Sequence, residues 1–460
     1  MRKFLGVLAV GVLGLTAPAV RAESLADALI AAYRNSNLLE QNQAVLRAAD
    51  ENVAIAVSNL RPVVQYSLQS TWSRSESAVT SDTPWNTSLS NALNLSVSMT
   101  LLDFGRNRLG IEIAEQSVLA TRQSLVGVEQ NILLEAVRAY VDVGFQSSVV
   151  ALRQSNVRLI GQELQAATDR FDVGEVTRTD VALAEAALAA SRAGLATAEG
   201  DLMLARERFR ATTGAYPGRL AGLPRAPATA NSLEGAREVA LRTHPDIRQS
   251  QHQVKLADLQ VQLAKAQMKP SLTGSLGVNE RFSDVNDSIG SRSLSLNLGQ
   301  TLYAGGELSA RHRLALAQKE QARAILQQAG VIVVENVGRA WTTINVARAS
   351  IEAGDLQIRA AQVAFDGVRE EAALGARTTL DVLDAEQNLL DARAGRLLAE
   401  ANLYIGIYQL LSSMGLLTAD HLKLGIPTYD VTGYYNAVRN APAHSPQGAK
   451  LDRILRSIGN

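Results

Sequence analysis

The chain has 460 residues, 45 acidic and 45 basic residues, and no cysteine. A net charge of zero without a dominant basic stripe argues against nucleic acid as a partner. The absence of cysteine excludes a disulfide framework and a thiolate metal site. The aromatic content of only 4% favours long, closely packed helices over one large globular core.

The N-terminus has the parts of a secretion signal. The basic pair Arg2 and Lys3 precedes an apolar run (4–15) and a small-residue cleavage site just before Glu23. We therefore expect 1–22 to be a signal peptide. No later segment is a continuous apolar stretch of about 20 residues, so no helix is expected to span a membrane.

The rest of the sequence consists largely of two similar copies. The segments 171–188 and 371–390 align with an offset of 201 residues. The matched pairs include Gly174 with Gly375, Asp180 with Asp381, and Glu185 with Glu386. Nearer the start of each copy the offset is 208, so seven residues are inserted in the first copy. This pattern predicts a duplicated structural unit.

The duplication defines the expected organisation of the chain. The first structural repeat covers 23–213 and the second covers 232–417. A proline-containing linker, 214–231, joins them, and the C-terminal tail 418–460 receives no structural assignment.

Long helices are predicted in both copies. No proline occurs between Pro84 and Pro217 or between Pro270 and Pro427, and apolar residues in these gaps follow a helical stripe. The predicted helices are 24–60, 105–171 and 178–213 in the first copy, and 232–269, 306–374 and 378–413 in the second. The longest helix of each copy would measure about 100 Å. Helices of that length need lateral neighbours in a coiled-coil-like array.

Two strands are predicted before the longest helix of each copy. They are 63–74 and 89–102 in the first copy, and 271–282 and 291–303 in the second. Apolar residues alternate with Ser, Asn, Thr or Gln, which is typical of transmembrane β-barrel strands of about ten residues, although a soluble two-faced sheet alternates in the same way. Four strands cannot close a cylinder, and lipid does not tolerate open edges. Several chains would therefore have to share one barrel, and three chains would supply twelve strands.

Together these features resemble the TolC family of outer-membrane efflux and secretion ducts. The resemblance covers roughly 24–417. Its first basis is the duplicated order of strand, strand and long helix. The others are the strand-to-helix junctions 101–105 (LLDFG) and 302–306 (LYAGG) and the motifs 173–181 and 374–384. It implies a mixed α and β membrane protein of a Gram-negative bacterium. The implied form is a homotrimer, whose twelve-strand β-barrel in outer-membrane lipid continues as a long periplasmic α-helical barrel.

The resemblance also implies a function. The family exports substrates together with a periplasmic adaptor (membrane fusion) protein and an inner-membrane transporter. The segment 173–181 (VGEVTRTDV) is especially similar to the branch that serves type I protein secretion. The outer-membrane component of a multidrug efflux pump is an alternative. A trimeric coiled-coil adhesin or structural fibre is a non-duct alternative, which would explain the long helices but not the repeated strand pairs. The linker 214–231 is expected at the equatorial level of the helical barrel.

The resemblance assigns roles to residues near two turns between helices. Asp381 and Asp384, three residues apart and so on one helical face, match the family's cation-selective pore constriction, where clustered carboxylates raise one another's pKa. Asp180 and Arg377 match a gate latch between neighbouring helical hairpins, although Ala372 stands where the best-known member has a latch tyrosine. The adaptor-contact tips match Val173, Gly174 and Glu175, and Leu374, Gly375 and Ala376. Solvated carboxylates, unrelated surface charges and plain helix caps are the alternatives.

No catalytic constellation is found in the sequence. The five histidines lack metal-ligand spacing, and no glycine-rich phosphate loop occurs. We therefore expect neither an enzyme, nor a metal site, nor a cofactor.

Overall fold

The computed structural model describes residues 22–76, 85–283, 289–441, 449–450 and 453. Apart from residue 22, the predicted signal peptide lies outside the described residues. The chain forms two compact units. The first comprises the described residues up to Asn35, together with Glu135–Pro227 and Val346–Ile405. The second comprises Ser36–Leu134, Ala228–Asn345 and the described residues from Gly406 onward. These units do not coincide with the two sequence repeats, because each repeat contributes residues to both.

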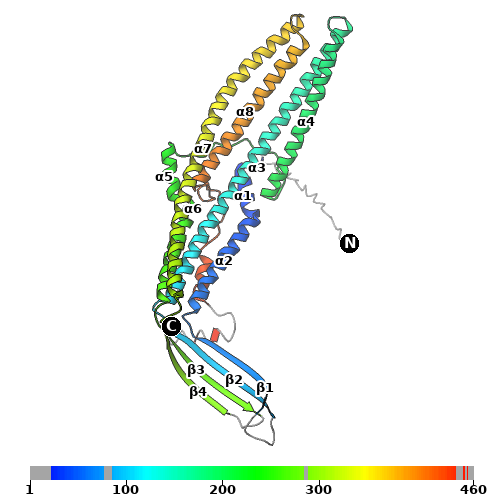
Figure 1. Cartoon of the computed structure of the whole chain (residues 1–460). Helices are drawn as coiled ribbons and strands as arrows, with labels where there is room; N and C mark the ends of the chain where they lie inside the picture. The colour runs from blue at the N-terminus through cyan, green and yellow to red at the C-terminus, as the bar shows by residue number, and fades with distance from the viewer. Residues whose placement is uncertain (1–21, 77–84, 284–288, 442–448, 451–452, 454–460) are drawn as a thin grey trace, which may run out of the picture. The chain divides into compact units, whose positions relative to one another are not determined.

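The second unit contains a four-stranded antiparallel sheet of order β1-β2-β3-β4 (Figure 1). Its strands are β1 (Val63–Glu76), β2 (Trp85–Leu102), β3 (Ser271–Ser283) and β4 (Ile289–Gly299). The prediction that the last strand reaches residue 303 is wrong. Gly299 already pairs with Ser271, the first residue of β3, so the chain beyond it has no strand partner there. The edges of this sheet are β1 and β4.

The strand register sorts the side chains into an apolar and a polar face. One row across the four strands contains Val64, Val97, Leu276 and Leu294. A row of the opposite face contains Ser67, Asn94, Asn279 and Ser291. On the edge strand β4, the apolar side chains Leu294, Leu296 and Leu298 are 66–73% exposed. Within one chain, the apolar face of the sheet is therefore not a core.

The helices α3, α7 and α8 each contribute to both units. The helices are α1 (Leu25–Asn35), α2 (Asn37–Ser58), α3 (Arg106–Asp172), α4 (Arg178–Thr213), α5 (Leu233–Thr243), α6 (Pro245–Ala266), α7 (Glu307–Ala373), α8 (Thr379–Ser413) and α9 (Gly433–Val438). With 67 residues each, α3 and α7 measure about 100 Å.

Two predicted helices are wrong as single helices. The segment 24–60 divides into α1 and α2 at Ser36, and 232–269 divides into α5 and α6 at His244. Ser36 is extended, and its hydroxyl accepts a hydrogen bond from the Leu39 N–H, so it caps a new helix. His244 is extended (ψ 129°) because the following proline disfavours helical backbone.

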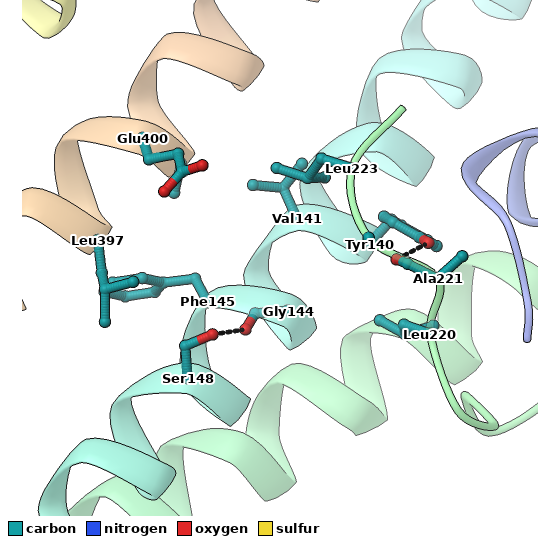
Figure 2. A pocket seen from close by; sticks show the side chains of 12 residues that line it. Tyr140, Val141, Gly144, Phe145, Ser148, Leu220, Ala221, Leu223, Leu397 and Glu400 are labelled. Atoms are coloured by element: carbon teal, nitrogen blue, oxygen red, sulfur yellow. Dashed lines mark hydrogen bonds between the residues drawn. The ribbon is translucent and has the colours of Figure 1, made fainter. Parts of the chain in front are cut away.

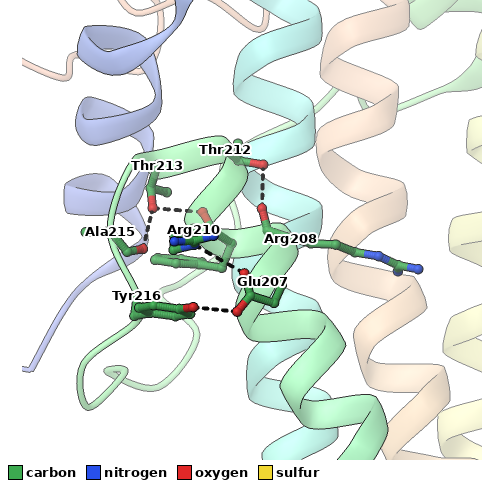
Figure 3. Close-up of polar contacts among 8 residues, drawn as sticks. Glu207, Arg208, Arg210, Thr212, Thr213, Ala215 and Tyr216 are labelled. Atoms are coloured by element: carbon green, nitrogen blue, oxygen red, sulfur yellow. Dashed lines mark hydrogen bonds and ion pairs between the residues drawn. The ribbon is translucent and has the colours of Figure 1, made fainter.

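A contact of the same kind lies at both breaks: a side chain beside the break donates a hydrogen bond to a backbone carbonyl at the end of another helix. The Asn35 amide donates to the carbonyl of Thr213 (2.5 Å). Thr213 is the last residue of α4, and its hydroxyl donates to the carbonyl of Phe209 (2.8 Å) and lies 3.1 Å from that of Ala215 (Figure 3). The Thr243 hydroxyl donates to the carbonyl of Met414 (2.6 Å), at the end of α8. These residues match under the offsets of 208 and 201. The broken short helices are therefore a repeated feature, fixed by the C-terminal end of a distant helix.

In the first unit, the linker between the repeats is held by two tyrosines. The Tyr140 hydroxyl lies 2.7 Å from the Ala221 carbonyl and 3.0 Å from that of Glu23, and can donate its proton to either. The Tyr404 hydroxyl donates to the carbonyl of Pro224 (2.7 Å). A mainly apolar pocket of about 200 Å³ lies between the linker, α3 and α8 (Figure 2). The linker thus contributes to the packing of this unit.

Part of the unassigned tail packs on the second unit. The Tyr434 hydroxyl donates to Glu51 of α2 (2.6 Å), and the Tyr435 hydroxyl donates to Glu115 of α3 (3.3 Å). The Arg122 guanidinium lies 5.3 Å from the centre of the Tyr435 ring. The described part of 418–460 therefore packs on α2 and α3 and is hydrogen-bonded to both helices.

Among the described residues, α4 alone is long and apolar enough by length and composition to cross a membrane. The expectation that no helix spans a membrane is not tested by this result and stays a prediction. The result reflects the many alanines of α4, and one such helix is weak support for a membrane span.

Replacing Gly415 with alanine is expected to destabilise the protein more than replacing Gly425. Both have positive φ (73° and 67°), so alanine costs about 1–2 kcal/mol at either position. Only at Gly415 would the new Cβ lie 2.8 Å from the Cα of His244, which adds about 1–3 kcal/mol of overpacking. Thermal unfolding of both variants measures the difference. Equal losses would contradict a constraint from the α5–α8 contact.

Candidate functional site: the two helical tips

Two turns in the first unit connect long helices to their successors. Tip 1 (173–177) lies between α3 and α4, and tip 2 (374–378) lies between α7 and α8. All the residues to which the resemblance assigns a role in the constriction, the latch or the adaptor contact lie in these turns or in the first two turns of the helices that follow them.

Both tips begin with the same helix cap. The Gly174 N–H donates to the carbonyl of Phe171 (2.9 Å), and the Glu175 N–H donates to the carbonyl of Arg170 (2.9 Å). Tip 2 has the same two bonds around Gly375 (3.1 and 2.9 Å). This is a Schellman motif, whose left-handed residue is best filled by glycine. Gly174 and Gly375 have φ of 79° and 78°, so the paired glycines have a structural role.

Both tips end with a capping box. The Asp180 carboxylate accepts from the backbone N–H (2.9 Å) and the hydroxyl (2.7 Å) of Thr177. In tip 2, Asp381 accepts the same two bonds from Thr378 (2.9 Å each). Each threonine hydroxyl in turn accepts from the N–H of its aspartate. These aspartates therefore stabilise the first turns of α4 and α8.

The predicted constriction residues lie on the first two turns of α8, where Asp384 is exposed. The hydrogen bonds from Thr378 hold the pKa of Asp381 below its usual value. Within one chain, these capping bonds to the charged form outweigh the small effect of burial, and Arg377 adds to the lowering. The rise in pKa expected where carboxylates of three copies gather stays a prediction. Asp381 carries a negative charge at neutral pH.

The two predicted latch residues have other partners in the single chain. The Arg377 guanidinium pairs with Glu371 of α7 (2.8 Å), and Asp180 is bonded to Thr177. No ion pair between Asp180 and Arg377 occurs among the residues that the structure describes. The side chain of Ala372 is buried in a cluster with Phe365, so it does not replace the tyrosine of the family's latch.

A polar seam that the sequence analysis missed joins α3 to α7 and α8. Its residues on α3 are Asn156, Glu163 and Arg170, which are seven residues apart and so share one stripe of the helix. The Asn156 amide donates to Glu386 (3.0 Å), Glu163 pairs with Arg369 (3.1 Å), and Arg170 donates to the carbonyl of Ala372 (3.2 Å). The heptad spacing is the sequence signal that could have revealed it.

Glu386 is the most buried carboxyl group of this seam, with 5% of its surface exposed. Its Oε1 accepts from Asn156, but its Oε2 is buried without a hydrogen-bonding partner. Burial raises the pKa of Glu386, and Glu163 adds to the rise, while Asn156, Arg393 and Arg369 oppose it. The repeat counterpart Glu185 is exposed.

A twice-repeated order of strand pair, long helix and tip defines an internally duplicated outer-membrane channel. The model of the outer membrane efflux protein family matches residues 29–215 and 236–416. The chain belongs to the outer membrane efflux protein family.

Relatives and solved structures agree with this assignment. The chain is 34% identical over 429 residues to the outer membrane efflux protein BepC of Brucella suis biovar 1, covering 93% of this chain and 92% of BepC. It is 28% identical to protein CyaE of Bordetella pertussis, covering 86% and 85% of the two chains. The outer membrane protein VceC of Vibrio cholerae has the same fold, with a TM-score of 0.73 at 20% identity, covering 85% of this chain and 96% of VceC. The predicted family, the outer-membrane location, and the assignment as an export channel and not an enzyme are confirmed.

Replacing Glu386 with glutamine is expected to flatten the pH dependence of stability. A carboxyl whose pKa is raised by folding contributes stability below its ordinary value of 4.5, and loses that contribution as pH rises through the raised pKa. The Glu386→Gln variant should therefore gain stability relative to the parent at pH 7, and the gain should shrink toward pH 4.5. Melting temperatures across this range measure the effect.

The matched control is Glu40→Gln, at an exposed position of α2. It should leave the pH profile unchanged. A Glu386→Gln profile parallel to that of the parent would contradict the buried, proton-sensitive carboxyl.

Proposed function

We propose that three copies of this chain form an outer-membrane duct. Its twelve strands, four from each copy, would form one β-barrel, and its long helices would form a periplasmic α-helical barrel. The observation that carries the proposal is the four-stranded sheet with two open edges and an exposed apolar face. In lipid, such edges need strand partners from other copies, and an apolar outer face with a polar inner face suits a barrel around water.

We propose protein export as the main function. The duct would receive its substrate from an inner-membrane transporter through a periplasmic adaptor protein, as in type I secretion. Two relatives named for secretion support this assignment: the proteases secretion protein PrtF of Dickeya chrysanthemi and the alkaline protease secretion protein AprF of Pseudomonas aeruginosa. Each is 25% identical to this chain, over 84% and 65% of its length.

Drug efflux is the second candidate function. BepC is named as an efflux protein, and its 34% identity over 93% of this chain favours this alternative. Co-purification from crosslinked cells distinguishes the two. Recovery of an adaptor with a protein-exporting ATPase would support secretion, and recovery of an adaptor with a drug pump would support efflux.

We propose roles for the tips in this duct. Asp381 and Asp384 of three copies would form the cation-selective constriction. Arg377 would exchange Glu371 for Asp180 of a neighbouring copy when the latch closes. Exposed ion pairs contribute only about 0–1 kcal/mol each, which suits a reversible latch. The adaptor would contact the tip residues Val173, Gly174 and Glu175, and Leu374, Gly375 and Ala376, where Val173 and Leu374 expose apolar side chains.

The mature protein is expected to fractionate with the outer membrane as a trimer that resists detergent and dissociates on heating, because its barrel is shared. Semi-native gel electrophoresis of membrane fractions measures this. A monomer that is soluble without detergent would contradict the duct, and a trimer outside the membrane would favour the fibre.

Replacing Asp381 and Asp384 with asparagine is expected to lower the preference for cations over anions by roughly tenfold, because carboxylates gathered at a constriction concentrate cations. Asparagine can still accept a capping bond, so the start of α8 is kept. Reversal potentials of single channels under a salt gradient measure the effect. Asp391→Asn, farther along α8, is the control, and equal selectivity in the two variants would contradict an electrostatic constriction at the tip.

A further inference from the structure

In the second unit, the described tail follows one stripe of α3 toward the sheet. The stripe consists of Glu129, Arg122 and Glu115, which are seven residues apart and so share one face of the helix. The Ala419 N–H donates to Glu129 (2.7 Å), and Tyr435 contacts both Arg122 and Glu115. These contacts span about 20 Å of helix. Since α3 follows β2 in the chain, the tail runs along α3 in the direction of the sheet.

The hydrogen-bond acceptors of the two tail tyrosines belong to the first repeat alone. The tyrosines donate to Glu51 of α2 and Glu115 of α3. The offsets of 208 and 201 place Leu259 and Leu316 at these positions in the second repeat, and a leucine side chain cannot accept a hydrogen bond. The tail is therefore specified for α2 and α3, and not for the corresponding helices α6 and α7.

An arginine ties the tail to the junction between α2 and β1. The Arg61 guanidinium donates to the carbonyl of Ala441 (2.7 Å) and to that of Asn440. Arg61 lies two residues before Val63, the first residue of β1. Position 441 of the tail is therefore fixed beside the start of the sheet.

The junctions between strands and helices have side chains that suit a membrane interface. Tyr303, between β4 and α7, is 86% exposed, and Phe104, between β2 and α3, is 44% exposed. The Lys269 ammonium, shortly before β3, lies 5.7 Å from the centre of the Phe104 ring. Aromatic girdles mark both interfaces of a transmembrane barrel, and lysine can extend from an apolar surface to the headgroups. In the proposed duct, the periplasmic surface of the outer membrane would lie at this level.

The end of the tail is basic and has an amphipathic sequence. Segment 439–460 contains four basic residues and one acidic residue, whereas the whole chain has no net charge. The described residues Ala449, Lys450 and Arg453 are helical and exposed. In the sequence, apolar residues at 451, 454, 455 and 458 have the spacing of one helical face. Basic residues beside an apolar stripe are typical of a helix that lies in a membrane interface.

The tie at Arg61 keeps these basic residues within reach of the membrane surface. Lys450 is nine residues beyond Ala441, a length of chain that spans at most about 30 Å. Each lysine or arginine near an anionic membrane surface strengthens binding about fivefold. A neutral lipid surface does not provide this attraction.

We propose that the tail is a strap that brings Lys450 and Arg453 to anionic phospholipid in the periplasmic leaflet of the outer membrane. The two side chains bind lipid phosphates, while the contacts with α2, α3 and Arg61 hold the segment close to the bilayer. The partner is an anionic lipid because the end of the tail is basic and amphipathic and is held at the level of the interface. This inference rests on the membrane-embedded sheet of the proposed function, and it adds a lipid-binding site outside the barrel.

A fluorescent label on the tail tests the lipid contact, since the chain has no cysteine of its own. Ala449→Cys is labelled with a nitrobenzoxadiazole dye, and the full-length protein is reconstituted into phosphatidylcholine vesicles with or without phosphatidylglycerol. Lipid with a spin label on its headgroup quenches a dye that lies at the membrane surface. Strong quenching is expected in the anionic vesicles, and weak quenching in neutral vesicles or at high salt, because salt screens the attraction.

Charge variants identify the residues that bind the lipid. Lys450→Gln combined with Arg453→Gln is expected to remove most of the difference in quenching between anionic and neutral vesicles. The matched control, Arg34→Gln combined with Arg225→Gln, removes two charges at exposed positions of the first unit and should keep that difference.

A third variant tests the tie. Arg61→Met keeps an apolar stem but loses the guanidinium that holds the tail carbonyls. It is expected to lower the quenching in anionic vesicles, because the basic segment is no longer held beside the bilayer. Unchanged quenching in this variant would overturn the role of Arg61 as the tie of the strap.

The outcomes separate this inference from the proposed function. Semi-native gels and vesicle flotation first show that each variant is an intact trimer inserted in the membrane. With such protein, equal quenching in anionic and neutral vesicles, or in the parent and the tail double variant, would overturn the lipid contact and leave the duct standing. A parent chain that does not float with the vesicles would overturn the membrane-embedded duct and, with it, the basis of this inference.

Discussion

The unpaired backbone groups along the edges of the sheet are the constraint on which the other features depend. β1 and β4 each present a row of N–H and C=O groups, and lipid offers no partner for them. The long helices have a related need, because α4 and α7 carry apolar side chains that one chain leaves exposed. In the proposed duct, neighbouring copies would supply the partners for both the strand edges and the exposed helix faces.

The tips show how one residue can both stabilise the start of a helix and hold a charge in a fixed position, which the proposed constriction would use. Asp180 and Asp381 cap the helices that follow each turn, and these bonds keep their carboxylates ionised. A charge fixed in this way on the first turn of a rigid helix keeps its position, which a selective constriction needs. The polar seam on α3 also holds α7 and α8 in place close to the same turns, through Asn156, Glu163 and Arg170.

Structural features that depend on neighbouring residues can be predicted from the sequence more readily than features that depend on contacts between distant segments. Alternating strands, proline-free gaps and the Thr-x-x-Asp pattern of each tip are local, so the sequence is informative about them. The break at His244 has a local signal in Pro245. The break at Ser36 is less predictable, because it lies next to a contact with the end of α4, more than 170 residues away. The end of β4 depends on where β3 begins, and the fixed part of the tail depends on its tyrosines meeting α2 and α3. The tip residues follow from the family resemblance. The heptad spacing of the seam on α3 is visible in the sequence, but it does not say that Glu386, 230 residues away, is the partner of Asn156.

The start of the first repeat lies beside the linker that follows that repeat. Glu23 forms a parallel bridge with Leu220, and the hydroxyl of Tyr140 lies within hydrogen-bonding distance of carbonyls on both segments. A unit whose ends are adjacent can be joined to a second copy by a few residues, without rearranging its interior. The geometry thus makes duplication of a half-sized ancestor, with fusion of the two copies, physically simple.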